Sequence, residues 1–160
     1  MDQTPNGKNK SMEGCVMLAL STFRRSEAAA EFAMEKSRET KELMIVYVVD
    51  INMARYLVDV EEDLLVGLRE TCESELLEKA EKEAGEFVSK IGEEAGKKGI
   101  RVQTHVQIGR FADVCLDLLK QTHPSVIVTT RSRRPEWVRK FFGSPVDELT
   151  AKAGCPVFVV

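Results

Sequence analysis

The sequence predicts a single α/β domain in which a five-stranded parallel sheet is doubly wound, with helices on both faces. The chain has 160 residues, which suits one domain. Short apolar segments typical of buried strands alternate with segments whose apolar residues recur every three or four positions. This alternation is typical of a parallel sheet with right-handed crossovers. We expect the domain to span residues 14–160, and the polar residues 1–13 to form a disordered tail.

The first third of the domain predicts two strands joined by a helix. The continuous apolar segments CVMLAL (15–20) and LMIVYVV (43–49) are typical of strands buried on both faces. Between them, Ser26 is a suitable N-cap for a helix whose inner residues are Ala29, Phe32, Ala33 and Ser37.

A long amphipathic helix is predicted next, ending near Gly96 and Gly99. If the pattern over residues 61–97 is unbroken, the helix is roughly 55 Å long at 1.5 Å per residue. A domain of this size is only about 40 Å across, so the helix must either break near Thr71 or overhang the sheet. We expect the apolar stripe to face the sheet, with Leu76 and Phe87 deeply buried; the stripe consists of Leu65, Leu68, Cys72, Leu76, Ala80, Ala84, Phe87, Ile91 and Ala95.

The second half of the chain predicts three more strands and two helices. The alternation in RVQTHVQI indicates a strand near a sheet edge, with Val102, Thr104, Val106 and Ile108 on one face. Pro156 is tolerated at the start of the last strand because the N–H that it lacks is not needed there. The predicted elements are a strand at 101–108, a helix at 111–121, a strand at 126–130, a helix at about 145–153 and a strand at 156–160.

Composition excludes several classes of function. The net charge of -3, the isoelectric point of about 5.6 and the 6% aromatic content argue against a nucleic-acid partner. No apolar segment reaches the ~18 residues needed to span a membrane, and the N-terminus does not resemble a signal peptide. The four cysteines lie at least 40 residues apart, which predicts reduced, buried thiols in a cytoplasmic protein and no metal site.

In a doubly wound sheet, ligands bind where the strand order reverses, so the loops after the first and fourth strands matter most. There Gly143-Ser144 precedes a predicted helix, and the chain closes with AGCPVFVV. From Cys15 to Val160, these features resemble the universal stress protein family. The resemblance implies the strand order 3-2-1-4-5 and a homodimer through the last strand. An apolar edge strand of this kind favours pairing with a second copy, here through Val157, Phe158, Val159 and Val160.

The ATP-binding motif of the resembled family is largely absent. Members that bind ATP carry an Asp after the first strand and G-x-x-G, nine residues, then G-S/T, after the fourth. The Asp position holds Ser21, and the first two glycine positions hold Thr130 and Arg133. The resemblance therefore implies weak or lost ATP binding and no firm cofactor, with an adenine nucleotide or an anion near Ser144 as the alternative. The altered pocket would contain Ser21, Val49, Thr130, Arg133, Gly143 and Ser144.

The segment TTRSRRPEWVRKFFGSPVDEL (129–149) allows several interpretations. Its arginines and lysine could form a solvated loop, an anion site with Arg133, or a patch for nucleic acid. Ser144, Pro145 and Asp147 match an N-cap, a first helical residue and a capping box, so Ser144 could cap a helix with or without binding an anion.

Nothing in the sequence indicates a catalytic site. His105 is expected to point outward and His123 to end a helix, and neither has an evident nucleophile partner. We predict a homodimeric regulatory or interaction module, with a protein partner that the sequence does not identify. The alternatives are a sensor that binds ATP or AMP in a modified pocket and an enzyme on the same scaffold, related to nucleotide-dependent α/β hydrolases.

Overall fold

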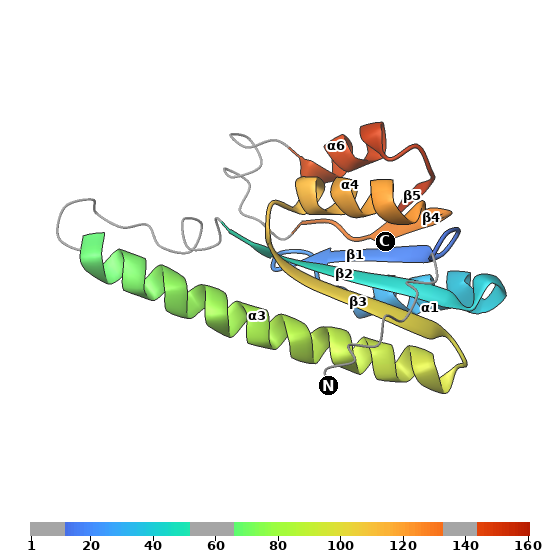
Figure 1. Cartoon of the computed structure of the whole chain (residues 1–160), viewed down its shortest axis with the longest axis horizontal. Helices are drawn as coiled ribbons and strands as arrows, with labels where there is room; N and C mark the ends of the chain where they lie inside the picture. The colour runs from blue at the N-terminus through green and yellow to red at the C-terminus, as the bar shows by residue number, and fades with distance from the viewer. Residues whose placement is uncertain (1–11, 52–65, 133–143) are drawn as a thin grey trace, which may run out of the picture.

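A five-stranded parallel sheet forms the centre of the molecule (Figure 1). The computed structural model describes residues 12–51, 66–132 and 144–160, and for residues 66–73 the backbone alone. The strand order β3-β2-β1-β4-β5 confirms the predicted 3-2-1-4-5 arrangement. The strands are β1 (Val16–Ser21), β2 (Glu42–Asp50), β3 (Arg101–Gly109), β4 (Val126–Thr129) and β5 (Val157–Val159).

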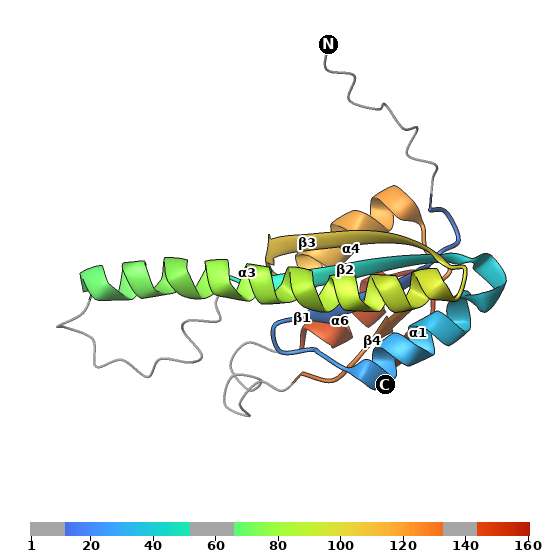
Figure 2. The same ribbon diagram turned by 90° about the horizontal axis from the view of Figure 1, so that it is seen from below.

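Helices cover both faces of the sheet, as the alternating pattern predicted. Helices α1 (Glu27–Thr40) and α3 (Val66–Lys97) lie on one face, and α4 (Phe111–Thr122) and α6 (Pro145–Lys152) lie on the other (Figures 1 and 2). Each face has its own apolar cluster, because successive residues of β1 and β2 point to opposite sides of the sheet. All of β1 is buried, which explains why its sequence is continuously apolar rather than alternating.

Helix α1 begins at the predicted N-cap, Ser26. The Ser26 hydroxyl accepts a hydrogen bond from the Ala29 backbone N–H at 3.0 Å, which satisfies one free donor of the first turn. The helix ends at Lys41, whose backbone is left-handed with φ 58° and donates to the Ser37 carbonyl.

Helix α3 is continuous and overhangs the sheet. Its 32 residues correspond to about 48 Å at 1.5 Å per residue, and its N-terminal part extends beyond the carboxyl ends of the strands (Figure 1). Of the two possibilities raised by its length, overhang is correct, and the helix does not break near Thr71. The predicted residues 61–65 lie outside the described part of the chain.

The stripe of α3 that faces the sheet differs from the predicted one, and the prediction that Leu76 and Phe87 are deeply buried is wrong. Both are only partly buried, and Leu77 rather than Leu76 packs against the core. Each helical residue adds about 100°, so Leu77 lies only about 20° from the direction of Ala84, whereas Leu76 lies about 80° away. The residues that face the sheet are Leu77, Ala80, Ala84, Val88, Ile91 and Ala95, with Phe87 at the side.

The β3 edge of the sheet and the start of the domain each contain a residue whose burial differs from the prediction. Strand β3 is an edge strand, as expected, but Ile108 on its predicted inner face is 39% exposed. Met12, which the sequence predicts to lie in the disordered tail, is instead buried in the cluster on the α4 side. The Gly14 backbone N–H then donates to the His123 carbonyl at 3.0 Å. Within the described chain, every helix is too short or too polar to span a bilayer.

Candidate functional site

The carboxyl ends of β1 and β4 mark the place where strand order reverses, since β1 pairs with β2 on one side and β4 on the other. We call this place, residues 21–24 with residues 129–131, the β1–β4 edge. Ser21, the last residue of β1, is buried. It forms a tight turn with Arg24, in which each backbone N–H donates to the carbonyl of the other at 2.9 and 3.2 Å.

The side chain of Arg24 occupies this edge. It is 2% exposed, and its guanidinium donates to the Thr130 carbonyl at 3.0 Å. The guanidinium also lies 4.9 Å from the ring centre of Phe111, the first residue of α4, at cation–π distance. Arg24 therefore links the end of β1, the end of β4 and the start of α4 through one buried cation.

Arg24 and its neighbour Arg25 go to opposite faces of the sheet. Arg25 lies 5.5 Å from the ring centres of both Tyr47 and Phe87, on the face covered by α1 and α3. Its Nε donates to the Tyr47 hydroxyl at 2.6 Å. Two adjacent arginines in a polar loop look equivalent in the sequence, so no local pattern could have identified Arg24 as the buried one.

The two threonines that follow β4 bond to the backbone of neighbouring strands. The Thr129 hydroxyl donates to the Ala19 carbonyl of β1 at 2.8 Å, and the Thr130 hydroxyl donates to the Val160 carbonyl at 2.7 Å. In return, the Val160 N–H donates to the Thr129 carbonyl at 2.9 Å. Thr130 is thus directed toward the end of β5 rather than toward Ser21.

The remaining candidate residues differ in where they lie. Val49 is fully buried in the cluster that faces α1 and α3, so its side chain is not at the β1–β4 edge. Ser144 is exposed and caps α6, accepting a hydrogen bond from the Asp147 N–H at 3.4 Å, with Pro145 at the first helical position. The predicted residues Arg133 and Gly143 lie outside the described residues.

The titratable groups of the described chain show no catalytic arrangement. Burial raises the pKa of the Cys15 thiol to about 11 and that of the Cys115 thiol to about 12, so neither is a thiolate near neutral pH. His105 is half-buried rather than pointing outward, and burial lowers its pKa; its Nε2 has no hydrogen-bond partner among the described residues. No group of three potential metal ligands occurs in the described segments.

Comparisons with known proteins agree with this architecture. No curated protein sequence matches the chain significantly. Among solved structures, the universal stress protein UspA from Lactobacillus plantarum has a TM-score of 0.68 at 18% identity, covering 92% of this chain and 98% of that chain. A universal stress family protein from Burkholderia pseudomallei has a TM-score of 0.60 at 17% identity, covering 94% and 97%. A universal stress protein solved in complex with cAMP has a TM-score of 0.56 at 11% identity, covering 92% and 97%.

At these identities the solved structures show that the fold is shared, and they do not show what this chain binds. The model of the universal stress protein family matches residues 15–160, which is nearly the whole domain. The chain therefore belongs to the universal stress protein family.

Proposed function

We propose that the protein is a cytoplasmic, homodimeric regulatory or interaction module of the universal stress type, with weak or no ATP binding. The position of Arg24 is the observation that supports weak or absent ATP binding. Its buried guanidinium bonds to the Thr130 carbonyl at the edge where a doubly wound sheet binds its ligand. A nucleotide could use this edge only if Arg24 moved, and the loss of a hydrogen bond to a charged group costs about 1.5–3 kcal/mol.

The residues around Arg24 support the same proposal. Ser21 offers no carboxylate to ribose hydroxyls, and Thr130, whose hydroxyl bonds to Val160, stands where the resembled ATP-binding pattern has a glycine. The loss of two or three hydrogen bonds would move a micromolar site toward millimolar, since each ~1.4 kcal/mol is tenfold.

Calorimetric titration with ATP tests this proposal. We expect no tight binding to the natural protein. Replacing Ser21 by Asp and both Thr130 and Arg133 by Gly should raise the affinity at least about tenfold, the effect of one recovered bond. In that triple variant, Arg24→Ala should raise the affinity further. The matched control is Arg25→Ala, which removes an arginine one position away on the opposite face.

Low-micromolar ATP binding by the natural protein, or ATP that co-purifies with it, would contradict the proposal. Equal effects of Arg24→Ala and Arg25→Ala would show that the buried guanidinium does not compete with the nucleotide. Circular dichroism of each variant establishes that it is folded before titration.

The homodimer is supported by the exposed apolar edge of β5. Phe158 and Val159 of β5 and the following residue, Val160, are 38–44% exposed, and the outer side of β5 has no partner among the described residues. Phe158 also lies against Phe32 of α1, with ring centres 5.4 Å apart, which holds its ring at the edge. We propose that the last strands of two copies pair in an antiparallel, two-fold manner.

Sedimentation velocity tests the dimer with two matched variants. Phe158→Glu places a charge on β5, whereas Ile108→Glu places the same charge at a 39% exposed position on the opposite sheet edge, β3. We expect only the β5 variant to become monomeric. A natural protein that remains monomeric at high micromolar concentration, or a dimer that survives Phe158→Glu, would contradict this arrangement.

A second candidate function is an adenine nucleotide sensor with a modified pocket. A neighbour of the same fold was solved with cAMP, and the exposed Ser144 at the start of α6 is a suitable place for an anion. Mass spectrometry of small molecules released from the denatured protein distinguishes the two: a bound nucleotide favours the sensor.

A further inference from the structure

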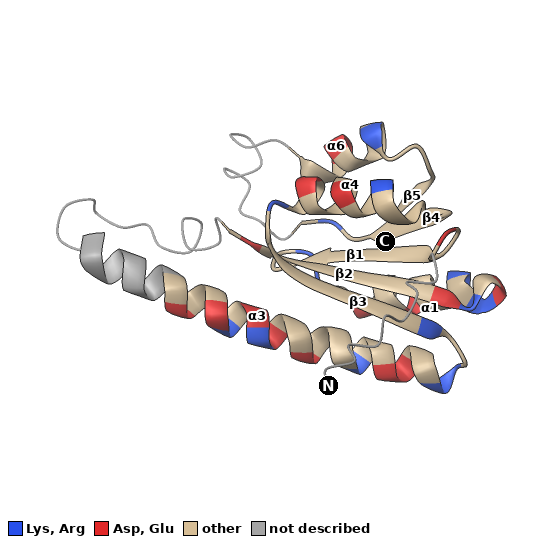
Figure 3. Ribbon diagram, in the orientation of Figure 1, with Lys and Arg blue, Asp and Glu red and all other residues tan. Residues whose placement is uncertain are grey.

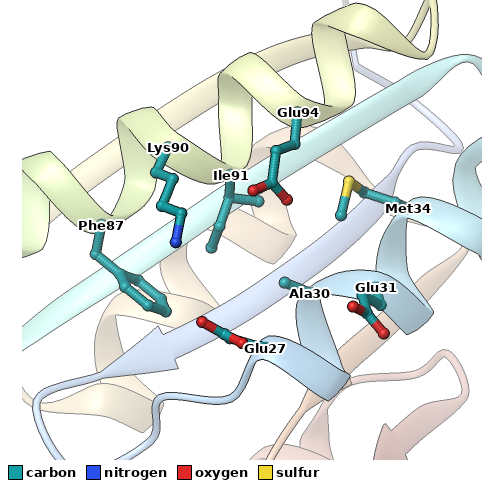
Figure 4. Close-up of a pocket in the computed structure, with 8 residues that line it drawn as sticks. All are labelled: Glu27, Ala30, Glu31, Met34, Phe87, Lys90, Ile91 and Glu94. Carbon is teal, nitrogen blue, oxygen red and sulfur yellow. The ribbon is translucent and has the colours of Figure 1, made fainter.

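A pocket of about 120 Å³ lies between α1 and α3 (Figure 4). We call it the α1–α3 pocket. Each helix contributes four residues spaced i, i+3, i+4 and i+7, so one face of each helix lines the space. The lining residues are Glu27, Ala30, Glu31 and Met34 from α1, and Phe87, Lys90, Ile91 and Glu94 from α3.

The floor of the α1–α3 pocket is apolar and held in place. Ala30, Met34 and Ile91 are buried members of the core cluster on this face. Phe87 packs edge-to-face against the buried Tyr47 at 6.3 Å, and Arg25 lies over its ring. These contacts hold the floor of the pocket in place.

The size of the α1–α3 pocket limits what can enter. A 150 Å³ apolar cavity accepts benzene, whereas pockets for drug-sized ligands measure roughly 300–1,000 Å³. A space of about 120 Å³ therefore accepts one aliphatic side chain and excludes a nucleotide.

The rim of the α1–α3 pocket is acidic. The carboxylates of Glu27, Glu31 and Glu94 and the amine of Lys90 surround the opening, which gives three negative charges to one positive (Figure 4). Figure 3 shows that both acidic and basic residues lie along α3. All four side chains are exposed, and none of them lies within 4.0 Å of an opposite charge among the described residues. The three rim carboxylates are therefore available to an incoming cationic partner.

We propose that the α1–α3 pocket is the docking site for a basic, amphipathic helical segment of a partner protein. The segment would insert one aliphatic side chain between Ala30, Met34 and Ile91, and its lysines or arginines would face Glu27, Glu31 and Glu94. The acidic rim favours a basic partner, and the volume of the pocket suits one aliphatic side chain. Binding of an amphipathic helix in an apolar groove is a common recognition mode. The inference rests on the interaction role proposed above and gives the chemistry of the partner.

Fluorescence anisotropy with a designed peptide tests the site. The probe is a fluorescein-labelled helical peptide of roughly 15 residues, with leucines on one face and lysines elsewhere. Two control peptides replace the lysines by glutamates or the leucines by serines. The groove variant is Glu31→Lys with Glu94→Lys. The matched control variant, Glu39→Lys with Glu78→Lys, changes the same two helices by the same charge at exposed positions outside the pocket.

We expect the Lys/Leu peptide to bind the natural protein and to shift the methyl resonances of Met34 and Ile91. The groove variant should bind about tenfold more weakly, as expected for the loss of two exposed ion pairs and their replacement by repulsion. The control variant should stay within about twofold. Both control peptides should bind weakly.

The absence of binding to the natural protein would overturn the proposal. Equal weakening of binding in both variants would also overturn it, because the peptide would then be attracted by net charge alone. Equal binding of the serine control peptide would also overturn it, because the apolar floor would then have no role. These results are independent of the ATP titration and the sedimentation test, so failure of the docking site is distinguishable from failure of the proposed function.

Discussion

Two adjacent leucines on α3 should differ clearly in what they contribute to stability. Leu77 packs against the core cluster on the α1–α3 side, whereas Leu76 does not. Both are partly buried leucines in the same helix, so Leu76→Ala and Leu77→Ala are matched changes. Ile91→Ala, at a position only 5% exposed, provides the reference for full burial.

The expected magnitudes follow from burial. Truncation of a buried Leu, Ile or Met to Ala costs about 2–5 kcal/mol, so we expect about 3 kcal/mol for Ile91→Ala. Leu77 is only partly removed from water, and about half of that loss, near 1.5 kcal/mol, is expected there. For Leu76→Ala we expect less than about 0.5 kcal/mol, since the slightly higher helix propensity of Ala offsets part of the lost contact.

Urea denaturation followed by circular dichroism measures these differences, with thermal melts as a second readout. In a chain of this length, 1 kcal/mol shifts the melting temperature by about 2–4 °C. Leu77→Ala should therefore lower it by roughly 3–6 °C, and Leu76→Ala by less than about 2 °C. If Leu76→Ala costs as much as Leu77→Ala, either the helix is rotated from the position described here or Leu76 is buried against another chain.

Three further predictions concern polar groups. Tyr47→Phe removes the hydroxyl that accepts from Arg25 and should cost about 1 kcal/mol in a urea titration, since Arg25 remains partly solvated; no change would mean that this bond adds nothing to folding. Burial lowers the pKa of His105 from 6.5, so the unfolded chain binds a proton first as the pH falls. Stability should decline as the pH falls below about 6.5, and His105→Gln should reduce this decline; an identical pH profile would refute this. Ser144→Ala should cost about 0.5–1 kcal/mol, with Ser144→Gly costing less, as capping requires; equal losses would indicate a different role.

Much of the fold could be predicted from local patterns. The continuous apolar segments around Leu18 and Ile45 indicated central strands, because residues buried on both faces leave no polar alternation. Ser26 and Ser144 indicated helix starts because capping depends on the residue itself and on its near neighbours. The strand order was inferred from the family resemblance rather than from periodicity.

The remaining features depend on contacts between distant segments. Arg24 and Arg25 are adjacent and chemically identical, and only the position of Thr130, 106 residues away, distinguishes the buried one. Leu76 and Leu77 both fit a helical stripe, and the choice depends on how α3 is rotated over the sheet. The α1–α3 pocket likewise requires two helices to be placed side by side, and no spacing within either helix predicts that distance.

Two buried thiols make the opening of one layer of this molecule observable by itself. Cys15 and Cys115 are both buried in the cluster on the α4 side, and their raised pKa values keep them protonated and slow to react. A thiol reagent can modify them only when that layer opens, so their labelling rate under native conditions measures the free energy of local opening there. Cys155 is only partly buried and serves as an internal reference for the reagent. Opening of the α1 and α3 layer leaves Cys15 and Cys115 covered, so a partner that stabilises only that layer would leave their labelling rates unchanged.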